Sequence, residues 1–375
     1  MKNSLLWYLR TIKDPRVWRT KIYELEWVLI IVICGTISGK KTLVEIADWA
    51  GYEREWFKNI FGINAIPSHD TVGRILAKIR HRDLAEAFNA WAKESLLDCE
   101  VTTVAIDGKT LCGSRNKTQP AKHIVSAWVG EVGLAIAAEL VPNGCSEPLA
   151  IKTILQRLIL DGDLRGKLVT IDAIATKKDI AALIVHGDGD YLLPIKKNNR
   201  DLCEEVQFLF EDAAKYKFKN INHTTHTAVE KGHGRIEKRH TVAIHDMNWL
   251  SKENRWIGLR TLIMTRRERI IGEKINIATV YHMSSFEADA ARFARLIREH
   301  WGIENNLHRA LDINFEEDAS RVRTGFAAYN LSVVRRISLS VLIHESSIRA
   351  GIAGKMRRAA NCPEYRNKLA QSIYA

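Results

Sequence analysis

The chain has 375 residues, of which 46% are hydrophobic, and this is enough for two or three hydrophobic cores rather than one. Its 56 Lys and Arg residues outnumber its 44 Asp and Glu residues and give a formal net charge of +12. This balance suits a polyanionic partner such as nucleic acid, with a merely solvated basic surface as the alternative. The six cysteines include no C-x-x-C pair, which argues against a zinc ribbon and against a disulfide framework.

Nothing in the sequence predicts a membrane segment. The apolar run Trp27–Cys34 is too short to span a bilayer. Residues 1–13 carry charges at both ends and no small-residue cleavage site, unlike a secretory signal. We therefore expect a soluble cytoplasmic protein.

Residues 1–97 predict an all-helical N-terminal domain. Tyr23–Ile37 is apolar nearly all round, as a buried helix would be. A later helix begins near Ser68 or Asp70, either of which can cap it. Its apolar face is formed by Val72, Ile75, Leu76 and Ile79. Arg74 and Lys78 should be more exposed. Three short helices with a capped last one resemble a helix-turn-helix DNA reader, with a plain helical scaffold as the alternative.

From residue 101 the pattern changes to strands that alternate with helices. We expect strands at 101–107, 124–129, 134–140, 167–172 and 191–195, with helices at 149–160 and 179–185. Residues 201–282 have a periodicity of their own, with a charged helix and then strands, and predict a mostly β insertion. Helices at 286–311 and 327–343 follow, and a basic tail occupies 351–375.

Two strand patterns each end on a single acid. Val101–Thr110 reads V-T-T-V-A-I-D-G-K-T, in which a β-branched run closes on Asp107 and a glycine lets the backbone turn away. Lys167–Ile174 repeats the pattern and closes on Asp172. A turn aspartate that accepts local hydrogen bonds is the alternative for either one alone. Two such strand ends together favour a divalent-cation site at the edge of a sheet.

Glu304 is the best candidate for a third acid, with Asp312 as the alternative. If residues 286–312 form one helix, Glu304 falls on the face that packs on the sheet. The members of that face are Phe293, Ile297, Trp301, Glu304, His308 and Leu311. A buried carboxylate needs a partner, so we expect a bound cation there, or else a salt bridge to an arginine. Three carboxylates can hold two Mg²⁺ or Mn²⁺ ions about 3.5–4 Å apart.

Three lysines lie just after predicted strands and could contact DNA phosphates. They are Lys109, Lys196 and Lys197. Solvated surface lysines are the alternative for each one.

Several motifs occur in an order that carries a family resemblance. They are D-P-R, I-P-S-H-D-T, A-I-D-G-K-T, V-T-I-D-A, Y-L-L-P-I-K-K-N-N, G-H-G-R-I-E and H-W-G-I-E-N-N-L-H-R-A-L-D. Together they resemble the H-repeat-associated (ISAs-type) insertion-sequence transposases of the DDE superfamily. The resemblance covers nearly the whole chain. Departures such as Lys177, where the family has glutamine, remove no expected metal ligand.

The resemblance implies both a fold and an activity. The fold is α/β: a ribonuclease H-like mixed sheet flanked by helices, with the helical N-terminal domain (1–97) and the β insertion (201–282) added. The catalytic domain would comprise 98–200 and 283–350, with Asp107, Asp172 and Glu304 as its DDE acids. The activity is Mg²⁺- or Mn²⁺-dependent cleavage at the ends of an insertion sequence, followed by strand transfer into target DNA.

The implied partners are the terminal inverted repeats and the target DNA. The expected assembly is a homodimer on DNA, in the cytoplasm and associated with the nucleoid. Two alternatives to the transposase stay open. One is an inactive or domesticated DNA-binding relic, and the other is a nuclease on the same fold.

Overall fold

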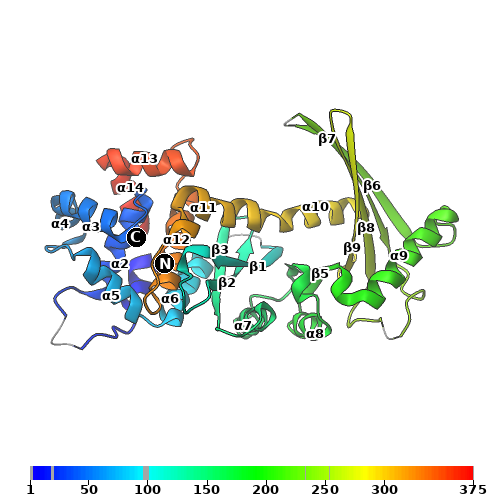
Figure 1. Cartoon of the computed structure of the whole chain (residues 1–375), viewed down its shortest axis with the longest axis horizontal. Helices are drawn as coiled ribbons and strands as arrows, with labels where there is room; N and C mark the ends of the chain where they lie inside the picture. The colour runs from blue at the N-terminus through cyan, green and yellow to red at the C-terminus, as the bar shows by residue number, and fades with distance from the viewer. Residues whose placement is uncertain (1–2, 18–20, 96–100, 233, 253, 375) are drawn as a thin grey trace. The chain divides into compact units, whose positions relative to one another are not determined.

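The computed structural model describes residues 3–17, 21–95, 101–232, 234–252 and 254–374, so the expected domain boundary at 97 lies outside the described residues. The chain divides into two compact units. Residues 1–101, 108–146 and 304–375 form a mostly helical unit, called the helical unit below. Residues 102–107 and 147–303 form the sheet unit. Figure 1 shows the course of the chain through both.

The helical unit begins with six helices. They are α1 (Leu5–Arg10), α2 (Leu25–Ile37), α3 (Leu43–Tyr52), α4 (Arg54–Phe61), α5 (His69–Lys78) and α6 (His81–Ser95). Helix α2 is buried along nearly its whole length, as its apolar sequence predicts. Ser68 caps α5 by accepting a hydrogen bond from the Thr71 backbone N–H, which confirms that predicted helix start. The prediction that α5 reads DNA is not tested by these contacts and stays a prediction.

The N-terminal helices do not form a core on their own. Helix α12 (Ala327–His344), near the other end of the chain, packs against α2, α5 and α6. Asn330 on α12 donates hydrogen bonds from Nδ2 to the carbonyl oxygens of Leu76 and Ile79 at 2.8 and 2.9 Å, which ties down the end of α5. This packing explains why α12 is buried on every side and why residues 1–97 are only part of a larger helical core.

The segment after residue 351, expected as a basic tail, folds into two helices among the described residues. It forms α13 (Ile352–Asn361) and α14 (Pro363–Tyr374). Arg366 donates hydrogen bonds to both carboxylate oxygens of Glu53 and lies over the rings of Trp49 and Trp56 at 5.4 and 4.8 Å. The charge of Arg366 therefore holds helices together, because burial of a cation requires partners inside the protein.

Strand β1 (Thr103–Leu111) belongs to both units. The sequence predicted that the strand ends at Asp107 and that Gly108 turns the chain. That prediction is wrong, since Gly108 lies inside the strand. The later residues of β1 belong to the helical unit, where β2 (Lys122–Val129) lies beside β1 and β3 (Leu134–Val141) lies beside β2. Strands β2 and β3 lie where the sequence predicts strands, and they pair antiparallel.

In the sheet unit, β1 is followed across the sheet by β4 (Leu168–Ile171), β5 (Asp190–Ile195), β9 (Lys274–Ser284), β8 (Thr261–Ile271), β7 (Arg235–Ile244) and β6 (His223–Gly232). The pairs β1–β4 and β4–β5 are parallel, whereas the strands from β5 to β6 pair antiparallel. The sheet is therefore mixed. The expected insertion is β-rich, and β9 joins it to the parallel strands through β5.

Four helices accompany this sheet. They are α7 (Glu147–Leu160), α8 (Lys178–His186), α9 (Arg200–Lys215) and α10 (Ala290–His300). Phe293 and Leu296 on α10 pack against strand residues such as Leu192 and Ile263. The upper right of Figure 1 shows the hairpins of β6–β7 and β8–β9 extending beyond α10. The apolar side chains of α10 and of these strands form a hydrophobic core of the sheet unit.

The predicted single helix over 286–311 is wrong. Helix α10 ends at His300, a π-helix spans Ile303–His308, and α11 follows (Arg309–Phe315). The wider turn of a π-helix, with i→i+5 hydrogen bonds, shifts every later residue around the helix axis. The buried side chains after the shift are Ile303, Leu307, Leu311 and Phe315. Trp301 and Glu304 are exposed instead of facing the core.

Candidate active site

Asp107 and Asp172 follow equivalent positions of two neighbouring parallel strands. The register pairs Thr103 with Leu168 and continues residue by residue to Ile106 opposite Ile171. Asp107 is the next residue of β1, and Asp172 is the residue that directly follows β4. Because parallel strands run in the same direction, both acids lie toward the same edge of the sheet. The two acids that the sequence singled out are therefore neighbours in the sheet unit.

Lys196 supplies a positive charge to Asp172. Its Nζ donates a hydrogen bond to Oδ1 of Asp172 over 3.1 Å from the residue that follows β5. Partial burial by itself raises the pKa of Asp172, but hydrogen bonds from the Ala173 backbone N–H and from Lys196 outweigh it, so the pKa is lowered. The Asp172 side chain is therefore ionised at neutral pH and remains 51% exposed.

The K-K-N-N sequence after β5 also shapes the turn that carries Asp172. Asn198 donates from Nδ2 to the carbonyl oxygen of Ala173 over 2.6 Å, and Asn199 donates to that of Thr176 over 2.9 Å. Two side-chain amides thus fix the short 3₁₀ turn Ala173–Ala175. Sequence reasoning considered only the lysines of this motif. The two consecutive asparagines shortly after β5 were the sequence signal that could have indicated a role in fixing this turn.

Two histidines border a small cavity next to β4. Nδ1 of His300 and Oγ1 of Thr170 are 2.8 Å apart, in hydrogen-bond contact. Burial lowers the pKa of His300 to about 4, although the nearby Asp172 carboxylate opposes the shift. Burial likewise lowers the pKa of His282 to about 3. With Leu192 and Pro194 these side chains border a cavity of about 30 Å³. The histidines are neutral at pH 7 and add no charge beside the carboxylate.

The remaining predicted contact residues have different surroundings. Arg74, Lys78 and Lys197 are exposed. Lys109 is buried, with its side chain 7% exposed, and its Nζ lies 2.8 Å from Asp312 and 3.2 Å from Asp318. The expectation that Lys109 contacts DNA phosphate is not supported by this placement, since its charge is already neutralised inside the helical unit.

Glu304 belongs to the helical unit, and the two aspartates belong to the sheet unit. Its exposure corrects the prediction that it faces the core, so burial of an unpaired charge no longer argues for a cation there. Asp312, the alternative third acid, is engaged with Lys109. Among the residues that the structure describes, no group of three or more His, Cys, Asp or Glu side chains is gathered closely enough to hold a metal ion.

The donor chemistry of the two neighbouring acids nevertheless suits a divalent cation. Two carboxylates on adjacent strands offer hard oxygen ligands, which Mg²⁺ and Mn²⁺ prefer. The Lys196 ammonium already places a cation against Asp172. Asp107 and Asp172 can therefore bind a cation. Further oxygen ligands from another acid, water or phosphate would be needed to complete its coordination shell.

Comparisons with known proteins place the chain in a family. Residues 91–340 match the model described as "Transposase DDE domain", and residues 6–92 match the one described as "DDE_Tnp_1-associated". The chain is 34% identical to "Putative transposase YncI" of Escherichia coli O157:H7 over 96% of this chain and 92% of that protein. It is 32% identical to "H repeat-associated putative transposase YhhI" of E. coli K12 over 96% of this chain and 95% of that protein.

A solved structure of a piggyBac transposase synaptic complex with hairpin DNA covers 97% of this chain and 78% of that one. Its sequence identity is 12% and its TM-score is 0.46, and no conclusion is based on it. Over the parts of the chain that are described, no helix is long and apolar enough to cross a membrane. Because the DDE model spans most of the chain and both E. coli relatives align with nearly all of it, this chain belongs to the DDE transposases, enzymes that cleave DNA and transfer its strands.

Proposed function

We propose that Asp107, Asp172 and Glu304 are the DDE acids of this transposase and that they hold two Mg²⁺ or Mn²⁺ ions. The observation that carries the proposal is the parallel register of β1 and β4, which sets Asp107 and Asp172 at adjacent strand positions. Glu304 is assigned on its place in the H-W-G-I-E-N-N motif and on its exposure, which leaves its carboxylate available to ligands.

When bound, two ions would activate a water or a 3′-hydroxyl and stabilise the leaving oxygen of a phosphodiester. The protein's own contribution is positional. Asn198 and Asn199 fix the turn after Asp172, so the carboxylate does not have to be ordered when ligands arrive. Hydrogen bonds from the Ala173 backbone N–H and from Lys196 lower the pKa of Asp172, so its carboxylate is in the ionised form that a metal requires.

The order of the strands supports a ribonuclease H-like core. The sheet here has β3-β2-β1-β4-β5, with antiparallel β2–β3 and parallel β1–β4 and β4–β5. We infer that β6–β9 are an insertion into this core ahead of Glu304.

Arg74, Lys78 and Lys197 are proposed to contact DNA phosphates, because each carries an exposed charge on a chain with a net charge of +12. Lys196 is exposed as well and is proposed to contact a DNA phosphate beside Asp172, whereas Lys109 is left out because it is buried. The proposed DNA partners are the terminal inverted repeats and the target. We also propose a homodimer on DNA, so that two element ends are held together, and a cytoplasmic location at the nucleoid.

The test uses the inverted repeats that would flank the reading frame. Purified protein should nick a duplex carrying such a repeat with Mg²⁺ or Mn²⁺, and EDTA should stop the reaction. Asp107→Asn, Asp172→Asn and Glu304→Gln should each remove cleavage while leaving DNA binding measurable. Cleavage that survives all three substitutions would reject the assignment. Binding without any metal-dependent cleavage would favour an inactive relic, and cleavage without pairing of two ends would favour a nuclease.

A further inference from the structure

Lys109 joins strand β1 to helix α11 inside the helical unit. Its Nζ donates to Oδ2 of Asp312 over 2.9 Å and to Oδ1 of Asp318 over 3.2 Å, and its side chain is 7% exposed. Asp312 lies on α11, and Asp318 lies on the 3₁₀ turn Glu317–Ala319 that follows. Burial lowers the pKa of Lys109, but the hydrogen bond and the charge of Asp312 outweigh it, so the pKa is raised. One buried cation thus connects a strand with a helix 203 positions further along the chain.

Backbone contacts hold the same junction at close range. A Cβ added at Gly113, just after β1, would lie 2.3 Å from the carbonyl oxygen of Ser320, so only glycine fits there. The Cys112 backbone N–H donates to Oδ1 of Asp318 over 3.4 Å, and Arg323 donates from Nε to the Gly113 carbonyl oxygen over 3.0 Å. The end of β1 and the chain after α11 are therefore in direct contact.

The strand side of this junction carries one of the proposed metal ligands. Asp107 precedes Lys109 by two residues in β1. Alternate residues of a strand project from the same face and lie about 7 Å apart along it. The carboxylate partners of Lys109 therefore lie over the face of β1 from which Asp107 also projects.

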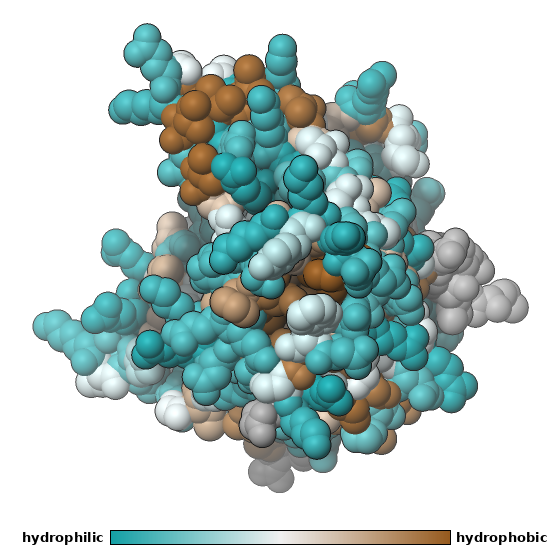
Figure 2. Space-filling model, turned by 90° about the vertical axis from the view of Figure 1, so that its right-hand side faces the viewer, coloured by the Kyte–Doolittle hydropathy of each residue, from teal (hydrophilic) through white to brown (hydrophobic). Residues whose placement is uncertain are grey.

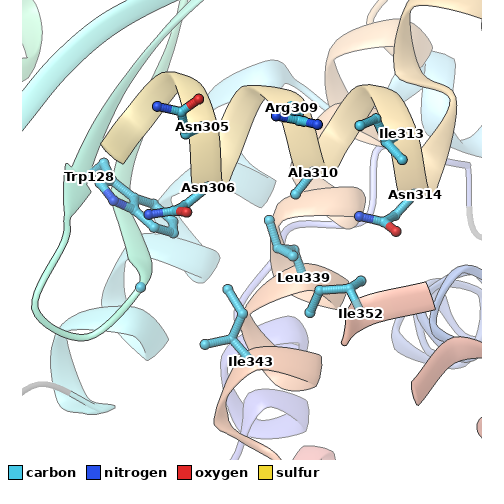
Figure 3. Close-up of a pocket in the computed structure, with 11 residues that line it drawn as sticks. Trp128, Asn305, Asn306, Arg309, Ala310, Ile313, Asn314, Leu339, Ile343 and Ile352 are labelled. Atoms are coloured by element: carbon cyan, nitrogen blue, oxygen red, sulfur yellow. The ribbon is translucent and has the colours of Figure 1, made fainter. Parts of the chain in front are cut away.

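The helix side carries another. Glu304 precedes Asp312 by eight residues, and the π-helix Ile303–His308 runs directly into α11. Figure 3 shows the stretch from Asn305 to Asn314 as one continuous helical ribbon. Eight helical residues span about 12 Å, and backbone hydrogen bonds fix each turn to the next. Where α11 is fixed therefore determines where Glu304 lies along the helix axis.

The ion pair fixes α11 in a way that its apolar packing does not. Leu311 and Phe315 are buried and hold the helix in the core. Apolar contacts are non-directional, so they resist a small sliding movement less than a charged hydrogen bond does. The bond from Lys109 to Asp312 is directional and sets one position of the helix on the strand.

We propose that Lys109 is a positioning residue, which fixes the Glu304 helix on β1 and so brings Glu304 to the metal ions held by Asp107 and Asp172. The inference rests on the proposed function, because it takes Glu304 as the third acid. In this role Lys109 touches neither the DNA nor the metal and acts through Asp312. A reacting group displaced by about 1 Å can lower a rate by about 100-fold, so one lost anchor is enough to affect cleavage.

The experiment compares two variants that each remove one buried cation from the helical unit. Lys109→Met should lower the single-turnover cleavage rate at saturating DNA by about 10- to 100-fold, with an unchanged dissociation constant for DNA. Arg366→Gln is the matched control, because Arg366 is 4% exposed and also binds a carboxylate, that of Glu53. It should destabilise the protein without lowering the cleavage rate, measured well below the melting temperature of both variants.

Two readouts do not depend on cleavage. Calorimetry should show that Lys109→Met binds Mn²⁺ about tenfold more weakly, whereas Arg366→Gln binds it normally. Hydrogen exchange of the amides of residues 304–315 should be about tenfold faster in Lys109→Met alone, as expected for loss of a charged hydrogen bond. Strands β8 and β9 of the sheet unit serve as the internal reference. Figure 2 shows apolar side chains gathered at the top of the view, and the exposed isoleucines of these strands are Ile271, Ile275 and Ile277.

A double-mutant cycle tests whether Lys109 acts through Asp312. If it does, Lys109→Met combined with Asp312→Asn should cleave no more slowly than Lys109→Met alone. Multiplied losses would mean that Lys109 contacts DNA or metal itself and would overturn the inference. Should Lys109→Met fail to fold, Asp318→Asn removes one partner, whose side chain is 40% exposed, and should slow cleavage about threefold at unchanged DNA affinity.

Glu304→Gln separates this inference from the proposed function. Cleavage by Glu304→Gln would reject the proposed acids whatever Lys109 does. Loss of cleavage in Glu304→Gln, together with wild-type cleavage and Mn²⁺ affinity in folded Lys109→Met, would reject the positioning role alone. Equal losses of cleavage in Lys109→Met and Arg366→Gln would reject it too, because they would reflect stability only.

Discussion

Lys196 and Asp172 form an ion pair, in which Nζ donates to Oδ1 over 3.1 Å. The two side chains are 58% and 51% exposed, so the pair contributes little to stability, about 0–1 kcal/mol. The ion pair matters instead for metal binding at Asp172. An ammonium group and a divalent cation would compete for the same carboxylate oxygen.

Removing the lysine should therefore tighten metal binding in the absence of DNA. Lys196→Met should bind Mn²⁺ about two- to fivefold more tightly than the wild type, as expected for loss of an exposed pair. Lys197→Met is the matched control, because Lys197 is exposed, and should be unchanged. Calorimetry with Mn²⁺ provides the measurement. Weaker binding in Lys196→Met would mean that the lysine supports the metal site instead of competing for it.

Lys109 should matter for stability and not for DNA affinity. Lys109→Met removes a buried cation and leaves Asp312 and Asp318 facing each other, so we expect unfolding to become easier by about 1–3 kcal/mol. Chemical denaturation gives the free energy, and anisotropy gives the DNA affinity. A Lys109→Met protein of wild-type stability with weakened DNA binding would restore Lys109 as a phosphate contact.

Two substitutions, each of which replaces a carboxylate by a neutral amide of the same size, decide between Glu304 and Asp312 as the third metal ligand. Glu304→Gln should eliminate cleavage and leave the melting temperature unchanged, because Glu304 is exposed. Asp312→Asn should retain measurable cleavage but melt earlier, because Lys109 loses one of its two partners. The opposite pattern of activities would move the third metal ligand to Asp312.

DNA affinity should fall steeply with salt, because each neutralised phosphate releases counterions. Arg74→Gln and Lys78→Gln should each reduce the slope of log K against log salt by about one unit. Arg366→Gln should instead reduce stability, since Arg366 is buried against Glu53 and two tryptophans. If neither exposed substitution alters the slope, α5 has a scaffold role.

The protein should lose stability as the pH falls below about 6.5. Burial lowers the pKa of His308 to about 3, with the nearby Arg336 acting in the same direction. The unfolded chain takes up a proton below pH 6.5, while the folded chain does so only near pH 3, so stability is fully present above 6.5 and is lost between these values. His308→Gln should reduce the loss between pH 7 and 4 by up to about 3 kcal/mol, measured by denaturation at each pH. Parallel pH profiles for the two proteins would contradict this.

Local patterns in the sequence were sufficient to place most elements. The apolar run at Tyr23–Ile37, the cap at Ser68, and the β-branched runs before Asp107 and Asp172 each correspond to a helix, a helix start or a strand in the structure. These features depend only on residues that are close together in the chain, so they can be predicted from the sequence. The order of the motifs also predicted the transposase family, and the comparisons with known proteins confirm that prediction.

Contacts between distant residues were decided by tertiary structure alone. The parallel register that aligns Asp107 with Asp172, and the pairing of Lys109 with Asp312 across 203 positions, leave no trace in local periodicity. The π-helix at Ile303–His308 was also hidden, because an α-helical period assumes 3.6 residues in every turn. Trp301 and Glu304, which that period assigns to the buried face, are exposed. Whether an acid faces a core or solvent depends on such turns and on what packs against them, and the sequence specifies these only through the whole fold.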